Sequence, residues 1–243
     1  MELDFSKNII HVNQIDSTND YAIERIKDPS FRLPSVIYSD YQYRGKGQYG
    51  KEWHSESGKN LLCSLVLNNS FDINDQFIIN AMFSLSVRDL LLDVGLRNVL
   101  LKWPNDILIN SKKIAGILIN NKISDQRIKY SILGLGLNIN QVSFPKFERE
   151  ATSIINEVDC LYDVKLILDN LITAFQNRYT QDHDNLIEDY TNTLYMRGEV
   201  VRLSKEGVEF EGVIKSIKRS GSLIVNVNNQ DFSFLSSEIK FID

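Results

Sequence analysis

Two apolar stretches with glycines in their interiors constrain the fold most. They cover residues 112–119 and 130–140, and both are rich in isoleucine and leucine. The pattern predicts a pair of strands in a sheet. Glycine weakens a strand interior and often marks the close approach of a ligand or another backbone, so Gly116, Gly134 and Gly136 indicate that something lies against this sheet. Tight packing of a helix on the sheet is the alternative interpretation.

Further strands and helices are predicted around this pair. Short apolar runs predict strands over residues 8–15, 35–39, 60–67 and 99–102. Helices are predicted over residues 17–27, 73–94, 164–179 and 185–194, with a turn-like segment over 151–157. The longest helix has apolar residues on more than one side and is followed by Gly95. We therefore expect it to be deeply buried and to end there.

The pattern changes near Arg197 into short alternating segments separated by polar turns. These segments cover residues 199–203, 208–217, 222–227 and 232–234. Several short strands in so short a stretch predict a small β-barrel. The sequence therefore predicts an α+β protein with a mixed β-sheet packed against helices. Its main domain would cover residues 1–194 and its barrel residues 195–243.

The charge balance of the chain argues against a nucleic-acid partner. The 243-residue chain carries a formal net charge of −5, whereas broad binding to a nucleic-acid backbone needs a dense lysine and arginine surface. In the C-terminal region, Glu206, Glu209 and Glu211 stand near Lys205 and Lys215, which argues against a phosphate-binding groove there. We expect no nucleic-acid partner.

The cysteines and the hydropathy indicate the cellular compartment in which the protein works. Cys63 and Cys160 stand alone, with no C-x-x-C pair, so the sequence suggests neither a zinc cluster nor a disulfide framework. We expect two buried thiols in a reducing compartment. The chain shows no basic and apolar leader and no apolar run of membrane-spanning length. We therefore expect a cytoplasmic protein without a membrane partner.

A glycine-punctuated stretch at residues 41–53 is a candidate ligand loop. Three glycines alternate there with Arg44, Lys46 and Lys51. Glycine lets a ligand approach the main chain closely, and successive N–H groups in such a turn form an anion-binding concavity. The loop would suit a phosphate or a carboxylate. A mobile surface turn is the alternative interpretation.

Lys102 ends an apolar strand, and Pro104 stops that strand immediately afterwards. A lysine at the mouth of a buried strand either snorkels outward or meets an anion in a cleft. Asn105 and Asp106 either form the next turn, or hold an ion or orient the lysine.

Ser17, Thr18 and Asn19 open the first helix, and two interpretations compete for them as well. As caps they satisfy orphan N–H groups of the helix, and as site residues they offer hydroxyl and amide groups to a polar ligand. Local sequence favours capping, because Ser17 and Asp20 have the spacing of a capping box.

In their order along the chain, these stretches resemble the biotin protein ligase family. The matching motifs are Ser17–Asn19 for S-T-N, Tyr41–Trp53 for the G-R-G-R-x-G-R-x-W loop, Gly58–Leu61 for the N-L strand, Lys102–Asp106 for K-W-P-N-D, Lys113–Gly116 for K-x-x-G and Gly134–Asn138 for G-x-G-x-N. The resemblance implies a biotin–lipoyl ligase catalytic domain, similar to class II synthetases, with a C-terminal Src-homology-3-like barrel. It also implies the form without an N-terminal DNA-binding domain, since a recognition helix needs more chain than precedes Asp16.

The resemblance implies a two-step reaction. The carboxylate of biotin attacks the α-phosphate of ATP, with magnesium, to give biotinyl-5′-adenylate and pyrophosphate. A lysine of a biotin carboxyl carrier protein or domain then attacks the acyl carbon, and AMP leaves. Bringing two anions together in line depends mostly on positioning and charge stabilisation.

The resemblance also assigns site residues. Lys102 is expected between carboxylate and phosphate, with Lys46 and Gln48 as further catalytic residues. Biotin binding is assigned to Ser17, Thr18, Asn19, Gln42, Gly45, Lys46, Gly47, Gln48, Lys102 and Gly116. Nucleotide binding is assigned to Lys51, Trp53, Asn60, Leu137 and Asn138, with Trp53 stacked on adenine. Asp106 is expected to steer the incoming lysine or magnesium.

The loop departs from the family pattern at three positions. Lys46, Gln48 and Lys51 replace the arginines of the family. Lysine lacks the planar fork of arginine and glutamine lacks its charge, so we expect weaker retention of the adenylate. The alternative functions are a lipoate or octanoate ligase or transferase of the same fold, and a non-catalytic biotin sensor. A homodimer paired through an exposed sheet edge is an assembly that one chain leaves open.

Overall fold

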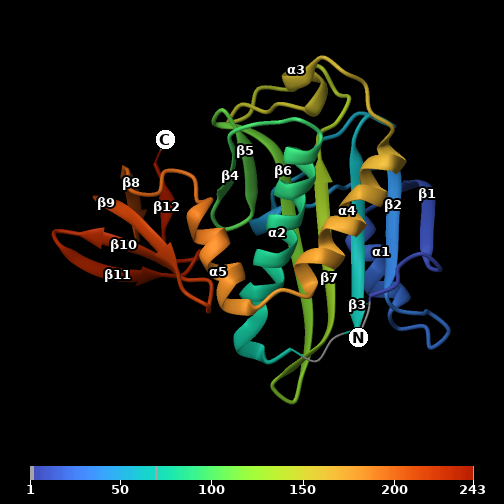
Figure 1. The fold of residues 1–243 in the computed structure, drawn as a ribbon, viewed down its shortest axis with the longest axis horizontal. Helices are drawn as coiled ribbons and strands as arrows, with labels where there is room; N and C mark the ends of the chain where they lie inside the picture. The colour runs from blue at the N-terminus through green and yellow to red at the C-terminus, as the bar shows by residue number, and fades with distance from the viewer. Residues whose placement is uncertain (1–2, 69–70, 243) are drawn as a thin grey trace.

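The computed structural model describes residues 3–68 and 71–242, which form two β-sheets with helices packed on the larger one (Figure 1). The larger sheet has the strand order β1-β2-β3-β7-β6-β5-β4. Its strands are β1 Ile9–Ile15, β2 Ser35–Gln42, β3 Leu61–Asn68, β4 Val99–Lys102, β5 Asp106–Ile109, β6 Lys112–Ser124 and β7 Arg127–Leu137. β1 and β2 run parallel and the other neighbours run antiparallel. The predicted mixed sheet is confirmed.

Five helices in the described part of the chain surround this sheet. They are α1 Thr18–Arg25, α2 Gln76–Asp93, α3 Ile154–Val158, α4 Val164–Tyr179 and α5 His183–Asn192. Figure 1 shows α2 and α4 side by side on one face of the sheet, whereas α1 packs on the other face. No helix among the described residues is long and apolar enough to cross a membrane.

The two faces of the sheet differ because side chains alternate along each strand. On β3, Leu61, Cys63 and Leu65 belong to the large core that includes α2 and α4. Between them, Ser64 and Val66 point to the α1 side. The face of the sheet that packs on α2 is therefore a closed hydrophobic core, whereas the face toward α1 also carries polar side chains such as Ser64.

The C-terminal strands form a five-stranded antiparallel sheet in the order β11-β10-β9-β8-β12. They are β8 Val200–Lys205, β9 Val208–Ile217, β10 Leu223–Val227, β11 Gln230–Phe234 and β12 Lys240–Phe241. This sheet is consistent with the predicted Src-homology-3-like barrel. The proposed domain boundary at residue 194 would fall in the connection between α5 and β8.

The turn between β9 and β10 docks the C-terminal sheet onto the rest of the molecule. The indole nitrogen of Trp103 donates a hydrogen bond of 2.9 Å to the carbonyl of Gly221. Gly221 has a φ of +87°, and a Cβ there would meet the ring of Phe77 under 3.0 Å. Arg219 of the same turn pairs with Asp75 at 2.8 Å. The contact thus joins this turn to the start of α2 and to the segment after β4.

Several sequence predictions are wrong in detail. Residues 154–157 of the predicted turn-like segment belong to α3, because Ser153 caps a helix there. Strands β5 and β12 were not predicted, since four-residue and two-residue strands carry little periodicity. Cys160 is exposed, whereas Cys63 is buried as expected and burial raises the pKa of its thiol. The predicted helix 73–94 begins as a 3-10 turn at Ile73–Asp75 and becomes α-helical at Gln76.

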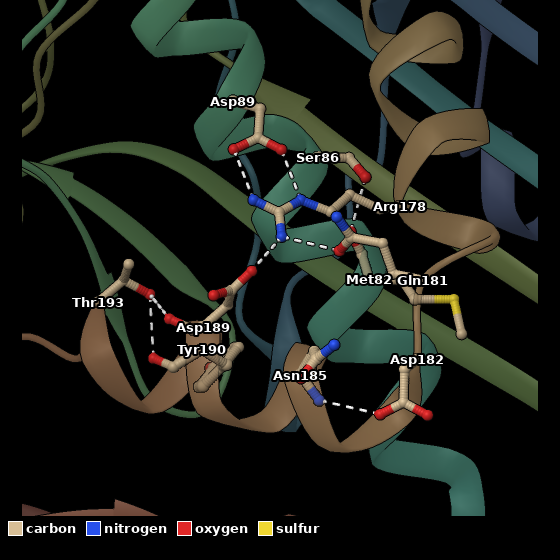
Figure 2. Close-up of polar contacts among 10 residues, drawn as sticks. All are labelled: Met82, Ser86, Asp89, Arg178, Gln181, Asp182, Asn185, Asp189, Tyr190 and Thr193. Carbon is tan, nitrogen blue, oxygen red and sulfur yellow. Dashed lines mark hydrogen bonds and ion pairs between the residues drawn. The ribbon is translucent and has the colours of Figure 1, made fainter.

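Arg178 of α4 joins three helices (Figure 2). Its Nε donates to Asp89 of α2 at 2.6 Å, and its Nη1 donates to Asp189 of α5 and to Gln181. The hydrogen bond to Asp89, and then the one to Asp189, raise the pKa of the guanidinium above its ordinary value. Only 13% of the Arg178 side chain is exposed. The network fixes how α5 sits on α2 and α4.

We expect Arg178→Met to lower the free energy of unfolding by about 2 kcal/mol, because it strips charged hydrogen-bond partners from two carboxylates. Urea unfolding followed by circular dichroism measures this. Lys165→Met is the control on the same helix, since Lys165 forms only an exposed pair with Asp169, and it should cost under about 0.5 kcal/mol. Equal losses in the two variants would contradict the assignment.

Candidate active site

A cavity of about 900 Å³ opens on the α1 side of the large sheet. Its walls come from the N-terminus of α1, the glycine loop, the β4–β5 hairpin, the strands β6 and β7, residues 144–151 and residues 236–241. The C-terminal sheet therefore contributes to the same cavity as the glycine loop and Lys102. A volume of this size suits a ligand as large as a nucleotide.

Basic side chains dominate the charge of the cavity, although the chain as a whole is acidic. Among the described lining residues, the basic ones are Lys46, Lys51, Lys102, Lys113, Arg149 and Lys240. The carboxylates are Glu52, Asp106 and Glu148. Six cations against three anions, in a chain of net charge −5, concentrate positive potential where a ligand would bind. The cavity is suited to an anionic ligand.

The glycines of β6 and β7 form the floor of the cavity. A Cβ on Gly134 would meet the Asn19 side chain under 3.0 Å, and a Cβ on Gly136 would meet the ring of Trp53 under 3.0 Å. A Cβ on Gly116 would touch the same ring at 3.0 Å. At Gly134 the alternative interpretation, helix packing, holds because Asn19 belongs to α1, whereas at Gly116 and Gly136 the group against the sheet is the Trp53 ring of the glycine loop. In this structure the groups are two side chains of the chain itself.

The hydroxyl and amide groups at the start of α1 form a buried network. The Ser64 hydroxyl of β3 lies 2.5 Å from Asn19 Oδ1 and 2.8 Å from Thr18 Oγ1, within hydrogen-bonding distance of both. The amide of Asn19 donates to the Leu118 carbonyl at 3.0 Å, and the backbone N–H of Thr18 donates to Gln42 Oε1 at 2.7 Å. Asn19 thus serves mainly to hold α1 on the sheet, and Ser64 is a member that sequence reasoning missed.

The structure confirms the capping role of Ser17, and its role in binding a ligand stays a prediction. Its hydroxyl accepts a hydrogen bond from the backbone N–H of Asp20 at 3.4 Å and so caps α1. Ser17 also lines the cavity and is 3% exposed. The cap therefore fixes the position of a polar group at one end of the cavity.

Two lysines line the cavity from β4 and β6, two strands that β5 separates. Lys102, at the end of β4, lies over the ring of Phe241 of β12, with its Nζ 5.4 Å from the ring centroid. Lys113, on β6, forms an ion pair of 2.7 Å with Asp106 and lies 5.5 Å from the Trp53 ring centroid. Asp106 does orient a lysine, but that lysine is Lys113. The K-x-x-G motif was the signal that could have assigned a role to Lys113.

The glycine loop closes one side of the cavity. Trp53 N–H donates to the Gly45 carbonyl at 2.8 Å, and Gly47 N–H donates to the Lys51 carbonyl at 2.7 Å. Tyr49 adopts a φ of +55°, and its hydroxyl donates to Ser236 of the C-terminal sheet at 2.9 Å. Lys46, Gly47, Gln48 and Lys51 line the cavity.

The residues assigned to the nucleotide divide into two groups. Asn138 lines the cavity, and its Oδ1 is buried without a hydrogen-bond partner, although its amide donates to the Thr152 carbonyl. Trp53 Nε1 is also buried without a partner. In contrast, Asn60 has its amide bonded to Ser55 and Gln141 and lies away from the cavity lining. Leu137, assigned to the nucleotide, and Gly45, assigned to biotin, also lie outside that lining.

A family model described as the biotin/lipoate A/B protein ligase family matches residues 12–138. This is more than half of the chain, and it includes every strand of the large sheet except the first residues of β1. The chain belongs to this family. The match also contains the glycine loop, Lys102, Lys113 and Asn138.

Individual relatives of this ligase-family chain agree with the match. It is 28% identical over 177 residues to the bifunctional ligase/repressor BirA of Bacillus spizizenii, which covers 71% of this chain and 54% of the relative. The chain thus spans about half the length of that relative. It is also 28% identical over 220 residues to the biotin–[acetyl-CoA-carboxylase] ligase of Paracoccus denitrificans, covering 86% of this chain and 90% of that one.

A solved structure supports the fold of this family member. The biotin protein ligase from Aquifex aeolicus, in complex with biotin and ATP, superposes with a TM-score of 0.79 at 24% identity. The superposition covers 97% of this chain and 99% of that one. The C-terminal sheet is therefore included in the shared fold.

We expect Gly136→Ala to cost about 2 kcal/mol of unfolding free energy, because the new methyl group would overlap the Trp53 ring. Urea unfolding of the single and double variants measures the cost. In a chain that also carries Trp53→Ala, the same change should cost under about 0.5 kcal/mol, since the overlapping ring is gone. An equal cost in both chains would show that Trp53 does not rest on Gly136.

Proposed function

We propose that this chain is an ATP-dependent biotin protein ligase. It would form biotinyl-5′-adenylate and then transfer biotin to a lysine of a biotin carboxyl carrier protein or domain. The observation that carries this proposal is the convergence of Lys102, Lys113 and the glycine loop on one basic cavity in an acidic chain. The names of its relatives, a biotin–[acetyl-CoA-carboxylase] ligase among them, support it.

The two ends of the cavity suit the two substrates. At the α1 end, Ser17, Thr18 and Gln42 offer neutral hydrogen-bonding groups to the ureido head of biotin. At the other end, the unpartnered Oδ1 of Asn138 is an acceptor suited to the amino group of adenine, and the Trp53 ring offers a stacking face. Lys102 and Lys113 line the same cavity from β4 and β6, and the carboxylate and the α-phosphate would meet beside them.

The first step would be an in-line displacement. A carboxylate oxygen of biotin forms a bond to the α-phosphorus, and the bond to pyrophosphate breaks. Lys102, Lys113 and the loop lysines would neutralise the two approaching anions and the leaving pyrophosphate. In the second step the carrier lysine, as a neutral amine, attacks the acyl carbon, and AMP leaves with the bonding electrons while the amine loses its proton to water.

Magnesium would enter with the nucleotide. No cluster of three or more metal-ligating side chains occurs among residues 3–68 and 71–242, and magnesium is usually held by one or two carboxylates plus substrate phosphates. Asp106, the carboxylate beside Lys113, is the residue that would hold it.

The use of ATP fits a cytoplasmic reaction. β1, an edge strand of the sheet, is the edge through which two chains would pair in a homodimer.

The decisive experiment is exchange of labelled pyrophosphate into ATP. Exchange that requires biotin supports the proposal, and exchange that requires lipoate or octanoate instead would assign the chain to the other branch of its family. Absence of exchange with either acid, combined with tight biotin binding, would identify a biotin sensor. Biotin transfer to a purified carrier domain then tests the second step.

We expect Lys102→Ala and Lys113→Ala each to slow biotin-dependent exchange by at least about 100-fold, because each removes a cation from beside the reacting anions. Lys112→Ala is the matched control. Lys112 is the neighbour of Lys113 on β6 but lies outside the cavity lining and pairs with Glu150 at 3.5 Å. Near-normal exchange in Lys102→Ala and Lys113→Ala would remove both lysines from the reaction.

We expect Gln48→Arg to slow the dissociation of biotinyl-5′-adenylate by about tenfold, since it restores a charged, forked donor on the cavity wall. Release of labelled adenylate into excess unlabelled biotin and ATP measures the rate. Gln48→Met, of similar size but without a donor, should not slow release. If the arginine variant releases adenylate as fast as the original chain, Gln48 has no part in retention.

A further inference from the structure

Asp20 and Lys46 form an ion pair beside the cavity. The Lys46 ammonium lies 2.7 Å from one carboxylate oxygen of Asp20 and 2.9 Å from the other. Asp20 is in the first turn of α1, where a negative charge is favoured by the helix dipole. Lys46 is in the glycine loop and lines the cavity, whereas Asp20 is outside the lining. Asp20 can therefore act on a ligand in the cavity only through Lys46.

The ion pair ties the loop to α1 beyond the point where the backbone holds it. At the base of the loop, Arg44 N–H donates to the Asp16 carbonyl at 3.0 Å. Past Arg44, the backbone hydrogen bonds from Gly47 N–H to the Lys51 carbonyl and from Trp53 N–H to the Gly45 carbonyl close the loop on itself and do not tie it to α1. The Lys46 side chain reaches back to Asp20, while Tyr49 reaches the C-terminal sheet at Ser236. These two side-chain contacts connect the loop to α1 on one side and to the C-terminal region on the other.

The same helix turn carries the polar groups of the biotin end. Asp20 N–H donates to Ser17 Oγ, and Thr18 N–H donates to Gln42 Oε1. A capping box would direct an acidic side chain at this position back to the start of its own helix. Here the Asp20 carboxylate is directed to Lys46 instead. Asp20 thus connects the cap of α1 to the cation of the loop.

We propose that Asp20 is a positioning residue that holds Lys46 and the glycine loop over the end of the cavity that binds biotin. The biotin half of this inference rests on the function proposed above, whereas the tether itself does not. The pair is half exposed, with 52% of the Lys46 side chain and 40% of the Asp20 side chain accessible. An exposed pair contributes modestly, so its loss should change loop opening by about threefold.

Limited trypsin digestion of the ligand-free full chain tests the tether. Cleavage after Lys46 and Lys51, followed by mass spectrometry, should be about threefold faster in Asp20→Asn. Asp20→Glu should restore the original rate, because it keeps the charge. Glu24→Gln is the matched control: it removes one charge from the same helix, and its partner Lys27 lies away from the cavity lining. An unchanged rate in Asp20→Asn overturns the proposal.

Steady-state pyrophosphate exchange tests the positioning. In Asp20→Asn, KM for biotin should rise about threefold while KM for ATP changes by less. A merely structural role would not separate the two substrates in this way. Faster digestion with an unchanged KM for biotin would overturn the positioning role. The digestion needs no substrate, so it tests the tether even if the chain proves to have no biotin-dependent activity.

Discussion

The site depends on one steric condition, the missing side chains on one face of β6 and β7. Alternation along β7 sends Leu133, Leu135 and Leu137 into the large core, while Gly134 and Gly136 face the opposite way. A Cβ at either glycine would collide with Asn19 or Trp53. Because the floor is bare, both side chains rest on the backbone of the sheet and the cavity reaches down between them.

Electrostatics then sets what this cavity can hold. Six basic side chains line it in a chain of net charge −5, so the surplus of negative charge lies elsewhere on the surface. The cations are not equivalent. Lys113 pairs with Asp106 and Lys46 with Asp20, and Lys102 lies over the ring of Phe241. The two carboxylates thereby hold Lys113 and Lys46 in place in the structure without a ligand, and such preorganisation reduces the reorganisation that ligand binding requires.

The C-terminal sheet is a part of the site rather than an appendage. Residues 236–241 line the cavity, and Tyr49 of the glycine loop bonds to Ser236. The bond from Trp103 to Gly221 also holds the sheet in place. Trp103 directly follows Lys102, so the segment that carries a proposed catalytic lysine also carries the docking point of the second sheet.

The sequence by itself determined the mixed sheet, the long buried helix and the C-terminal strands, because hydrophobic periodicity reports which face of an element is buried. Its motifs also indicated Lys102, the glycine loop and Asn138. Only the tertiary structure decided that Asp106 pairs with Lys113, that Ser64 joins the α1 network and that Asn60 is held away from the cavity. These contacts join residues far apart along the chain, and local patterns carry no information on which distant partner a polar side chain will meet.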